Sequence, residues 1–366
     1  MNKKKLVIIY WNLGIGGIQK RIRDMALHVS RNKDDWDVII LIRKSLPEGF
    51  NDQIIPKSNL RIETYPFNTR KIRPIGGFFI WILYKYIQLK PNVCLTFLPL
   101  LGVSLCLIKK IAFWVKSKLV INEGVVLSEY LALHKLRWLH VLVSKTYKYA
   151  DHIIVPTLAC QNDLTVNFLL NTESISVIPN WTLIKKHKLA KNQLYDVIYV
   201  GRFDTEKNVL AICEVAKILI NKYSDLKIIL IGSGELLSAL HSKISNLNIE
   251  KNMYIHTFTT RVPDFIYRSK LLILPSLSEG MPNVVLESAM LQVPSITSDF
   301  KGSEEVVVHG RTGFIAKNIK ELASYVNILL LNDKRRRDMG KFAQKFVSKS
   351  FTHTAQAKFL KTLLQT

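Results

Sequence analysis

The stretch that decides the fold is YDVIYVGRFDTEKN, residues 195–208. It begins with six residues of apolar strand character, reaches Gly201, and then leads into a run of helical length. In parallel α/β sheets, ligands bind beyond the carboxyl ends of the strands, so we expect Arg202 and Lys207 to face a ligand there. Two cations at such a point are suited to neutralising a diphosphate.

A second stretch of the same kind is LLILPSLSEGMPNVVLE, residues 271–287, where a polar loop again follows an apolar strand. Pro282 suits the first position of a helix, where a missing N–H costs nothing. The free amides that follow, and the positive end of the helix, are then directed at an anion. Glu279 lies in the loop and Glu287 about two turns further along, so the two carboxylates are expected near opposite ends of one ligand.

Glycine turns follow two other expected strands. One contains Gly14, Gly16 and Gly17, whose backbone can approach a phosphate or a sugar closely. The turn is not a dinucleotide fingerprint, because Gln19 stands where a third glycine would be needed. A turn at residues 232–234 has the same form, and the chain contains no GxxxxGK[ST] motif, which disfavours ATP hydrolysis through a P-loop.

The sequence therefore predicts a ligand-binding set at the strand ends of the second half. Its members beyond the two cations and Glu279 are Gly201, Asn208, Gly232, Gly234, Gly280, Met281, Pro282, Asn283, Val284 and Glu287.

Composition limits the class of protein. A chain of 366 residues divides naturally into two domains of roughly 150–180 residues, and a hydrophobic content of 48% excludes general disorder. The four cysteines lack CxxC spacing and the nine histidines lack an HExxH motif, so neither a disulfide framework nor a metal site is expected. The stretch Met1–Lys5 leads directly into an expected strand and no small-residue cleavage site follows, so a secretion signal is not expected and a cytoplasmic location is predicted.

Apolar runs of strand length alternate with amphipathic runs of helical length, which is typical of doubly wound α/β folds. The sequence predicts a first domain over 1–182, a second over 183–350, and a C-terminal helix over 351–366 that packs back on the first domain. Residues 185–193 are the expected linker. Strands are expected at Leu6–Tyr10, Val38–Ile42, Arg61–Tyr65, Val93–Leu98, Leu119–Ile121, Ile153–Val155, Ile175–Ile178, Tyr195–Val200, Lys227–Ile231, Met253–His256, Leu271–Leu274, Ser295–Thr297 and Gly313–Ala316.

The net charge of +24 is concentrated in the first half, where residues 57–148 contain 15 Lys or Arg and 3 Asp or Glu. The same region is rich in aromatic residues, and this combination suits peripheral docking on an anionic membrane surface. The uncharged apolar run Val93–Ile108 is shorter than the ~20 residues of a spanning helix. The alternative is that the aromatics are helix core and the lysines a solvated face. Nucleic-acid binding is not expected, because no matching motif accompanies the charge.

The chain resembles the retaining, nucleotide-sugar-dependent glycosyltransferases of family four, which have the two-domain GT-B fold. Four features carry the resemblance in order: the turn at 14–17, the segment 201–208, the pair Glu279 and Glu287, and Lys301-Gly302-Ser303-Glu304-Glu305 followed by the turn at 310–314. The resemblance implies two Rossmann-like doubly wound domains that face each other across a cleft. It extends over the second half well and over the first half loosely.

Roles for several residues follow from this resemblance. In the family, the counterparts of Arg202 and Lys207 contact the donor diphosphate, that of Glu279 the donor sugar, and that of Glu287 the ribose. Relatives often carry a histidine or an acid after the strand that here is Leu119–Ile121, which makes Glu123 the candidate acceptor-side base. Glu123 could instead be a surface carboxylate paired with a lysine.

No metal and no cofactor are expected, since the two cations and the helix end supply positive charge for the leaving diphosphate. The one DxD-like run, Asp35-Trp36-Asp37, precedes a strand and is interpreted as a solvated loop. No nucleophile is assigned.

Three functional classes remain open at this stage. The first is transfer of a sugar from a nucleotide-sugar, UDP-linked or next GDP-mannose, to a lipid-linked glycan, at the inner face of a bacterial cell membrane. Capsule or lipopolysaccharide synthesis would need such an enzyme. The second is a GT-B enzyme with a soluble product, and the third is a non-catalytic module that binds sugar nucleotides.

Overall fold

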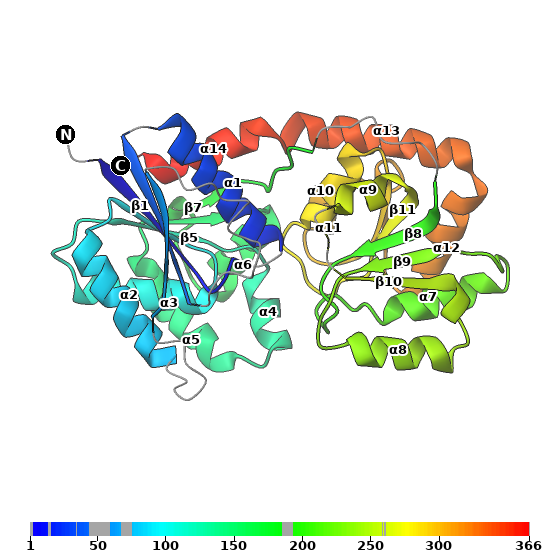
Figure 1. Ribbon diagram of the computed structural model, residues 1–366, viewed down its shortest axis with the longest axis horizontal. Coiled ribbons are helices and arrows are strands. Elements are labelled where there is room, and N and C mark those ends of the chain that lie inside the picture. The colour runs from blue at the N-terminus through cyan, green and yellow to red at the C-terminus, as the bar shows by residue number, and fades with distance from the viewer. Residues whose placement is uncertain are drawn as a thin grey trace. The chain divides into compact units, whose positions relative to one another are not determined.

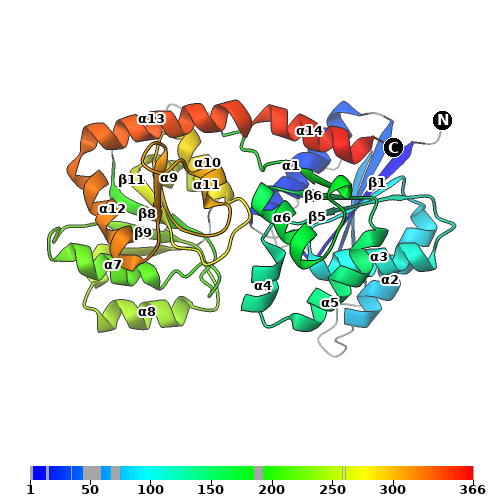
Figure 2. The same ribbon diagram turned by 180° about the vertical axis from the view of Figure 1, so that it is seen from behind.

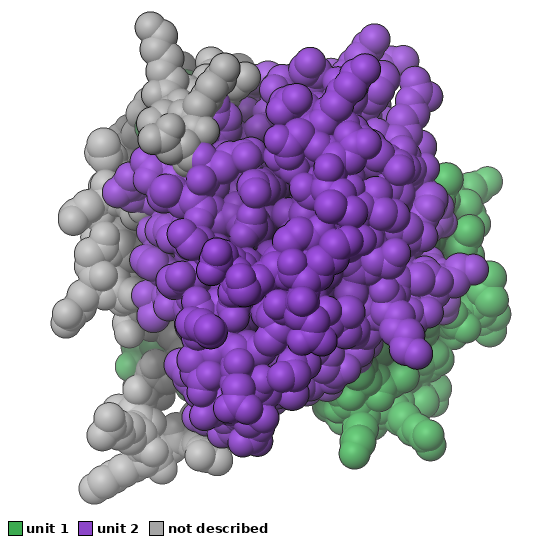
Figure 3. Space-filling model, turned by 90° about the vertical axis from the view of Figure 1, so that its right-hand side faces the viewer, with its two compact units in different colours: residues 1–178, 358–366 green, residues 179–357 purple. Residues whose placement is uncertain are grey.

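The computed structural model describes residues 3–13, 16–33, 35–43, 59–66, 75–184, 193–257, 259 and 261–365. The chain divides into two compact units (Figures 1 and 3). The first consists of Met1–Ile178 together with Lys358–Thr366, and the second of Pro179–Ala357. The division between the units thus comes a few residues before the expected one, and only the last part of the expected C-terminal helix belongs to the first unit. Of the expected linker, only Gln193 lies within the described residues.

The first unit is built on a parallel sheet whose strand order is β3-β2-β1-β4-β5-β6-β7. Val, Ile and Leu dominate its central strands, which are buried along most of their length, as expected for a sheet with helices on both faces. The strands are β1 (Lys4–Tyr10), β2 (Trp36–Ile42), β3 (Leu60–Thr64), β4 (Val93–Thr96), β5 (Lys118–Asn122), β6 (His152–Val155) and β7 (Ile175–Val177).

The helices of the first unit are α1 (Gly17–Asn32), α2 (Ile75–Leu89), α3 (Pro99–Ile111), α4 (Leu127–Leu133), α5 (Arg137–Thr146) and α6 (Leu158–Asn167). Helix α3 packs between α2 and α5 on one face of the sheet, away from α1 (Figures 1 and 2). Helix α14 (His353–Leu364) ends in this unit, where Arg21 lies over the ring of Phe359 at 4.6 Å.

The second unit has a parallel sheet in the order β10-β9-β8-β11-β12-β13. Its strands are β8 (Tyr195–Val200), β9 (Ile228–Ile231), β10 (Met253–His256), β11 (Ser269–Leu274), β12 (Ser295–Ser298) and β13 (Gly313–Ala316). Its helices are α7 (Ala211–Ile220), α8 (Leu237–Asn246), α9 (Val262–Tyr267), α10 (Asn283–Met290), α11 (Ser303–Val306), α12 (Ile319–Leu331) and α13 (Asp333–Ser350). Strands β8 and β11 are neighbours, so the loops that follow them meet at one edge.

Each unit is therefore a Rossmann-like parallel α/β domain with its own hydrophobic core. Every strand expected from the sequence is present, and its bounds differ by at most two residues. Three local expectations are wrong. The helix after β8 begins at Ala211, beyond a series of turns, and Pro282 precedes α10 as its N-cap with ψ at 114°, outside the helical region. Asp37 lies inside β2 rather than in the loop before it.

Candidate functional site

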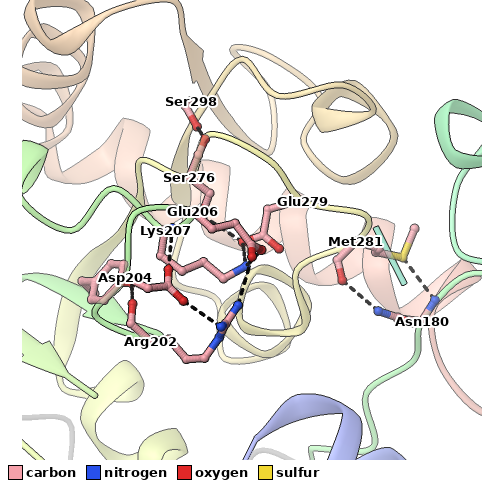
Figure 4. Close-up of polar contacts among 10 residues, drawn as sticks. Asn180, Arg202, Asp204, Glu206, Lys207, Ser276, Glu279, Met281 and Ser298 are labelled. Atoms are coloured by element: carbon pink, nitrogen blue, oxygen red, sulfur yellow. Dashed lines mark hydrogen bonds and ion pairs between the residues drawn. The ribbon is translucent and has the colours of Figure 1, made fainter. Parts of the chain in front are cut away.

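The turn after β8 gathers charged side chains around one buried carboxylate, Glu206 (Figure 4). Arg202 Nη2 lies 3.1 Å from Glu206 Oε2, and its Nη1 lies 2.7 Å from Asp204 Oδ2. Lys207 Nζ lies 2.9 Å from Glu206 Oε1. The two predicted cations are thus held on either side of the same carboxyl group, which the sequence analysis had not identified.

Lys207 also joins this turn to the loop after β11. Its Nζ lies 2.9 Å from Glu279 Oε1, and Ser276 Oγ donates to the same oxygen at 2.9 Å (Figure 4). Ser298 Oγ donates in turn to the Ser276 carbonyl. The expectation that Arg202, Lys207 and Glu279 lie together at one sheet edge is therefore met in the geometry of the second unit.

Electrostatics keep Lys207 and Glu206 charged. Burial lowers the pKa of Lys207, but the adjacent carboxylates Glu279 and Glu206 raise it more, and the net shift is upward. Burial alone would raise the pKa of Glu206, yet Lys207 and Arg202 lower it overall. The Lys207 side chain is 15% exposed and that of Arg202 is 57% exposed, so both cations remain reachable from solvent. The site can therefore present fixed positive charge to an anion.

Close backbone contacts fix the shape of the turn. The Gly201 amide donates to the Ile231 carbonyl at 3.0 Å, and the Phe203 amide donates to the Ser233 carbonyl at 2.9 Å. A Cβ on Gly232 would lie 1.9 Å from the Gly201 carbonyl oxygen, and one on Gly234 would lie 2.3 Å from that of Phe203. These glycines let the turn after β9 pack directly against the turn after β8.

Asn208 ends the turn with a φ of 49°, in the left-handed region that asparagine tolerates better than most residues. Its amide donates to the Thr205 carbonyl at 3.2 Å. The backbone conformation gives Asn208 a structural reason to stand at this position.

The loop before α10 is buried and held in place by Asn180. The Asn180 side-chain amide donates to the Met281 carbonyl at 2.8 Å, and its backbone amide donates to Met281 Sδ at 3.2 Å (Figure 4). Gly280, Met281 and Pro282 are buried here, while Asn283 and Val284 open α10 in a half-buried position. Glu287 lies one turn further along α10, also half-buried.

The predicted residues of the first unit have a different setting. Gly14 lies outside the described residues, whereas Gly16 and Gly17 mark the start of α1, as expected. Glu123 is 1% exposed and lies just after β5. Its Oε1 accepts a hydrogen bond from the hydroxyl of Tyr147, and burial raises its pKa to about 7. The alternative of a surface carboxylate paired with a lysine is therefore wrong.

The basic region of the first unit exposes large apolar side chains as well as lysines. Phe113 is 75% exposed and packs edge-on against Trp114, which is 54% exposed. Other exposed members are Ile80 and Tyr84 on α2, Leu107 and Ile111 on α3, and Trp138 and Val141 on α5. The alternative that the aromatic residues form the helix core is correct for residues such as Phe78 and Tyr86, which are buried, but not for the exposed set.

Within the described ranges, no helix is both long and apolar enough to cross a bilayer.

Comparisons with known proteins bear on the second unit most directly. Residues 180–346 match the model of the family described as glycosyl transferases group 1. An Escherichia coli protein, UDP-Gal:alpha-D-GlcNAc-diphosphoundecaprenol alpha-1,3-galactosyltransferase, is 28% identical over 52% of this chain and 53% of its own length. The chain spans about half the length of this and several other curated relatives that it matches.

One curated relative matches over nearly the whole chain. It is the N-acetylgalactosamine-N,N'-diacetylbacillosaminyl-diphospho-undecaprenol 4-alpha-N-acetylgalactosaminyltransferase of Campylobacter jejuni, which is 24% identical over 91% of this chain and 92% of its own length.

A solved structure shows the same fold. The Anabaena protein HepE, in complex with UDP and glucose, superposes with a TM-score of 0.79 at 17% identity, over 98% of this chain and 99% of that chain. The segment 180–346 that matches the family contains Arg202, Glu206, Lys207 and Glu279. This segment of the second unit is therefore similar to the glycosyl transferases group 1 family.

Proposed function

We propose that this protein is a retaining glycosyltransferase that moves a sugar from a nucleotide-sugar to a lipid-linked glycan. The observation that carries the proposal is the cluster of Arg202, Lys207 and Glu279 at the ends of two neighbouring strands, inside the segment that matches the family. Hexosyl and N-acetylhexosaminyl donors both fit the proposal. It extends to synthesis of a bacterial surface polysaccharide, such as a capsule or lipopolysaccharide.

The chemistry to be performed is departure of a nucleoside diphosphate from an anomeric carbon. Negative charge grows on the diphosphate as the bond breaks, and Arg202 and Lys207 are cations already oriented to receive it. One preorganised donor of this kind is typically worth about 2.7–4 kcal/mol of barrier. Glu279, tied to Lys207, would accept hydrogen bonds from sugar hydroxyls, and Glu287 from the ribose. In this mechanism the positive charge comes from the side chains, with no metal.

A uridine nucleotide is the preferred donor in this proposal. It is supported by the complex with UDP and glucose of the Anabaena protein, whose fold this chain shares. The lipid-linked acceptor is supported by the names of the Escherichia coli and Campylobacter jejuni relatives, which specify undecaprenol-linked acceptors. Glu123 is retained as the candidate acceptor-side base, although its carboxyl would have to become accessible from its buried position.

Peripheral docking at the cytoplasmic face of a membrane completes the proposal. The exposed apolar set around Phe113 and Trp114 lies among Lys109, Lys110 and Lys116 in the sequence. Between residues 75 and 150 the only acids are Glu123, which is buried, and Glu129. Cations beside aromatics favour anionic headgroups over water.

The experiment that tests the activity is a thermal-shift panel with UDP, GDP, ADP, TDP and their common sugar conjugates, in buffer containing EDTA. We expect one nucleoside diphosphate to raise Tm selectively in the wild type and to lose this effect in Lys207→Ala. The conjugate that stabilises most is then assayed for transfer to a polyprenyl-diphosphate-linked acceptor. Equal stabilisation of wild type and variant, or none by any nucleotide, would contradict the proposal.

A further inference from the structure

We propose that Glu206 is a positioning residue for the diphosphate clamp, the name used here for Arg202 and Lys207. This inference rests on the proposed function, because it assigns to Glu206 the task of orienting cations that receive the donor's phosphates. No motif in the sequence pointed to Glu206, which stands directly before Lys207 and four residues after Arg202.

Glu206 uses each oxygen of its carboxylate for a different cation. Oε1 accepts from Lys207 Nζ at 2.9 Å, and Oε2 accepts from Arg202 Nη2 at 3.1 Å. One buried carboxyl group thereby links the two positive charges and sets their spacing, while Asp204 Oδ2, 2.7 Å from Arg202 Nη1, holds the other side of the guanidinium group. A diphosphate has two charged groups at a fixed separation, so this spacing determines whether both cations can be used together.

The hydrogen bonds of Lys207 indicate how loss of Glu206 would change the orientation of its ammonium group. An ammonium group has three N–H donors, and in the described part of the chain Glu206 and Glu279 each accept one, at 2.9 Å. Two fixed acceptors hold the ammonium group in one orientation and leave the third N–H available to a ligand. If Glu206 no longer accepted, Glu279 would be the single fixed carboxylate, and the ammonium group could rotate.

Glu206 itself is held firmly. It is 2% exposed, and its backbone carbonyl accepts from the Leu277 amide at 2.8 Å. Leu277 belongs to the loop after β11 that also contains Glu279. The residue therefore fixes the clamp through its side chain and the neighbouring loop through its backbone, which suits a positioning role.

A carboxylate beside an anion site can have two roles, and neutralising it changes the affinity for the anion in opposite directions in the two cases. A carboxylate that only repels or competes with the phosphates would weaken binding, and its neutralisation would tighten the complex. A carboxylate that orients the cations would strengthen binding, and its neutralisation would loosen the complex. The sign of the change therefore distinguishes positioning from competition.

The test measures the affinity of wild type and of Glu206→Gln for two ligands by calorimetry. UDP is titrated directly, and the affinity for uridine is obtained from its displacement of bound UDP. Gln keeps the shape of Glu but accepts through a single oxygen and carries no charge. We expect UDP affinity to fall about tenfold, the scale of one lost charge-assisted hydrogen bond. Uridine affinity should stay unchanged, because the nucleoside makes no use of the clamp.

Matched variants separate this effect from a general loss of structure. Glu214→Gln removes a carboxylate paired with Lys243 at 2.5 Å on the same unit, and should change neither affinity. Lys207→Met combined with Glu206→Gln should weaken UDP binding by less than the product of the two single effects, since one residue acts through the other. If Glu206→Gln fails to fold, Glu206→Asp keeps the charge but shortens its reach, and the same selective loss is expected.

Failure of the role assigned to Glu206 and failure of the proposed function give different results. Tighter UDP binding by Glu206→Gln, an equal loss for uridine, or fully multiplicative effects with Lys207→Met would overturn the inference and leave the proposed function standing. If wild type binds none of UDP, GDP, ADP and TDP, the proposed function fails and the inference fails with it.

Discussion

Glu123 illustrates how a single side chain can depend on a distant neighbour. Its Oε1 accepts from the hydroxyl of Tyr147, which also lies 3.5 Å from the Pro99 carbonyl oxygen, and its Oε2 has no hydrogen-bond partner among the described residues. Gly102 leaves the space for that hydroxyl, because a Cβ there would lie 2.6 Å from it. Burial favours the protonated form of this carboxyl group and raises its pKa, while the hydrogen bond donated by Tyr147 lowers the pKa and offsets part of that effect.

Stability should therefore depend on pH through Glu123. Burial raises its pKa from 4.5 to about 7, so the folded state binds more protons than the unfolded state between these values. Folding stability must then fall as pH rises from about 4.5 to about 7, and the full cost remains above that range. Gln cannot ionise and can still accept from Tyr147. We expect Glu123→Gln to raise Tm near pH 8, corresponding to about 1–3 kcal/mol, and to leave it unchanged near pH 4.

Thermal unfolding of both proteins across this pH range checks the prediction. Tyr147→Phe serves as the companion variant, since it removes the donor and should further favour the neutral carboxyl. A difference in Tm between wild type and Glu123→Gln that does not vary with pH would show that the carboxyl stays ionised when buried.

At the scale of elements, the site depends on two turns that touch through their backbones. The turn after β9 lies against the turn after β8 so closely that Gly232 has no room for a side chain. Gly232→Ala would place its Cβ 1.9 Å from the Gly201 carbonyl oxygen, and the backbone next to Arg202 must shift. We expect this variant to lower Tm and to lose most of its affinity for nucleoside diphosphates, since ~1 Å of displacement can cost about 10²-fold.

Gly76→Ala is the appropriate control, because nothing lies within 4 Å of a Cβ at that position of α2. Thermal melting of both variants without UDP measures their stability, and the rise in Tm on adding UDP measures nucleotide binding. Unimpaired UDP stabilisation of Gly232→Ala would mean that the clamp tolerates movement of its supporting turn.

The elements also show what a sequence can and cannot predict. The strands were predictable because a buried parallel strand is a short apolar run, and the ends of β8 and β11 brought Arg202, Lys207 and Glu279 together. The start of α7 was not, because the turns at 204–210 are set by side-chain contacts such as Asp204 Oδ1 accepting from the Lys207 amide at 2.9 Å. Glu206 was missed because it lies in a turn, whereas a spacing of four residues from Arg202 indicates an ion pair only within a helix.

For the whole molecule, the net charge of +24 and the exposed aromatics of the first unit make membrane binding a property that can be measured directly. We expect the protein to float with vesicles that contain anionic lipid and not with purely zwitterionic ones. Raising the salt should weaken binding, because exposed charges are screened beyond about 8 Å at physiological ionic strength. Phe113→Ser with Trp114→Ser should weaken it further at constant salt.

Phe342→Ser is the matched control, since Phe342 is an exposed aromatic of the second unit. Binding that is lost equally in this control would show that apolar exposure in general is responsible. No binding by the wild type to anionic vesicles would contradict the membrane proposal and favour an enzyme with a soluble product.

The division into units was harder to predict than the units themselves. Apolar periodicity indicates where strands and helices lie, but membership of a unit depends on contacts between residues far apart in sequence. Lys118 Nζ, for example, donates to the Thr362 carbonyl at 2.7 Å, a pairing that no local pattern indicates.

This discontinuity has a consequence for biosynthesis. Phe359 and Leu363 are fully buried, and they belong to the first unit although the whole second unit precedes them in the chain. On the ribosome, residues 179–357 are therefore all synthesised before residues 358–366, which complete the first unit. The nascent chain must hold an incomplete amino-terminal unit, with the Phe359 site beside Arg21 uncovered, until translation has passed residue 363. Until then, that uncovered site is apolar surface of the kind that chaperones recognise.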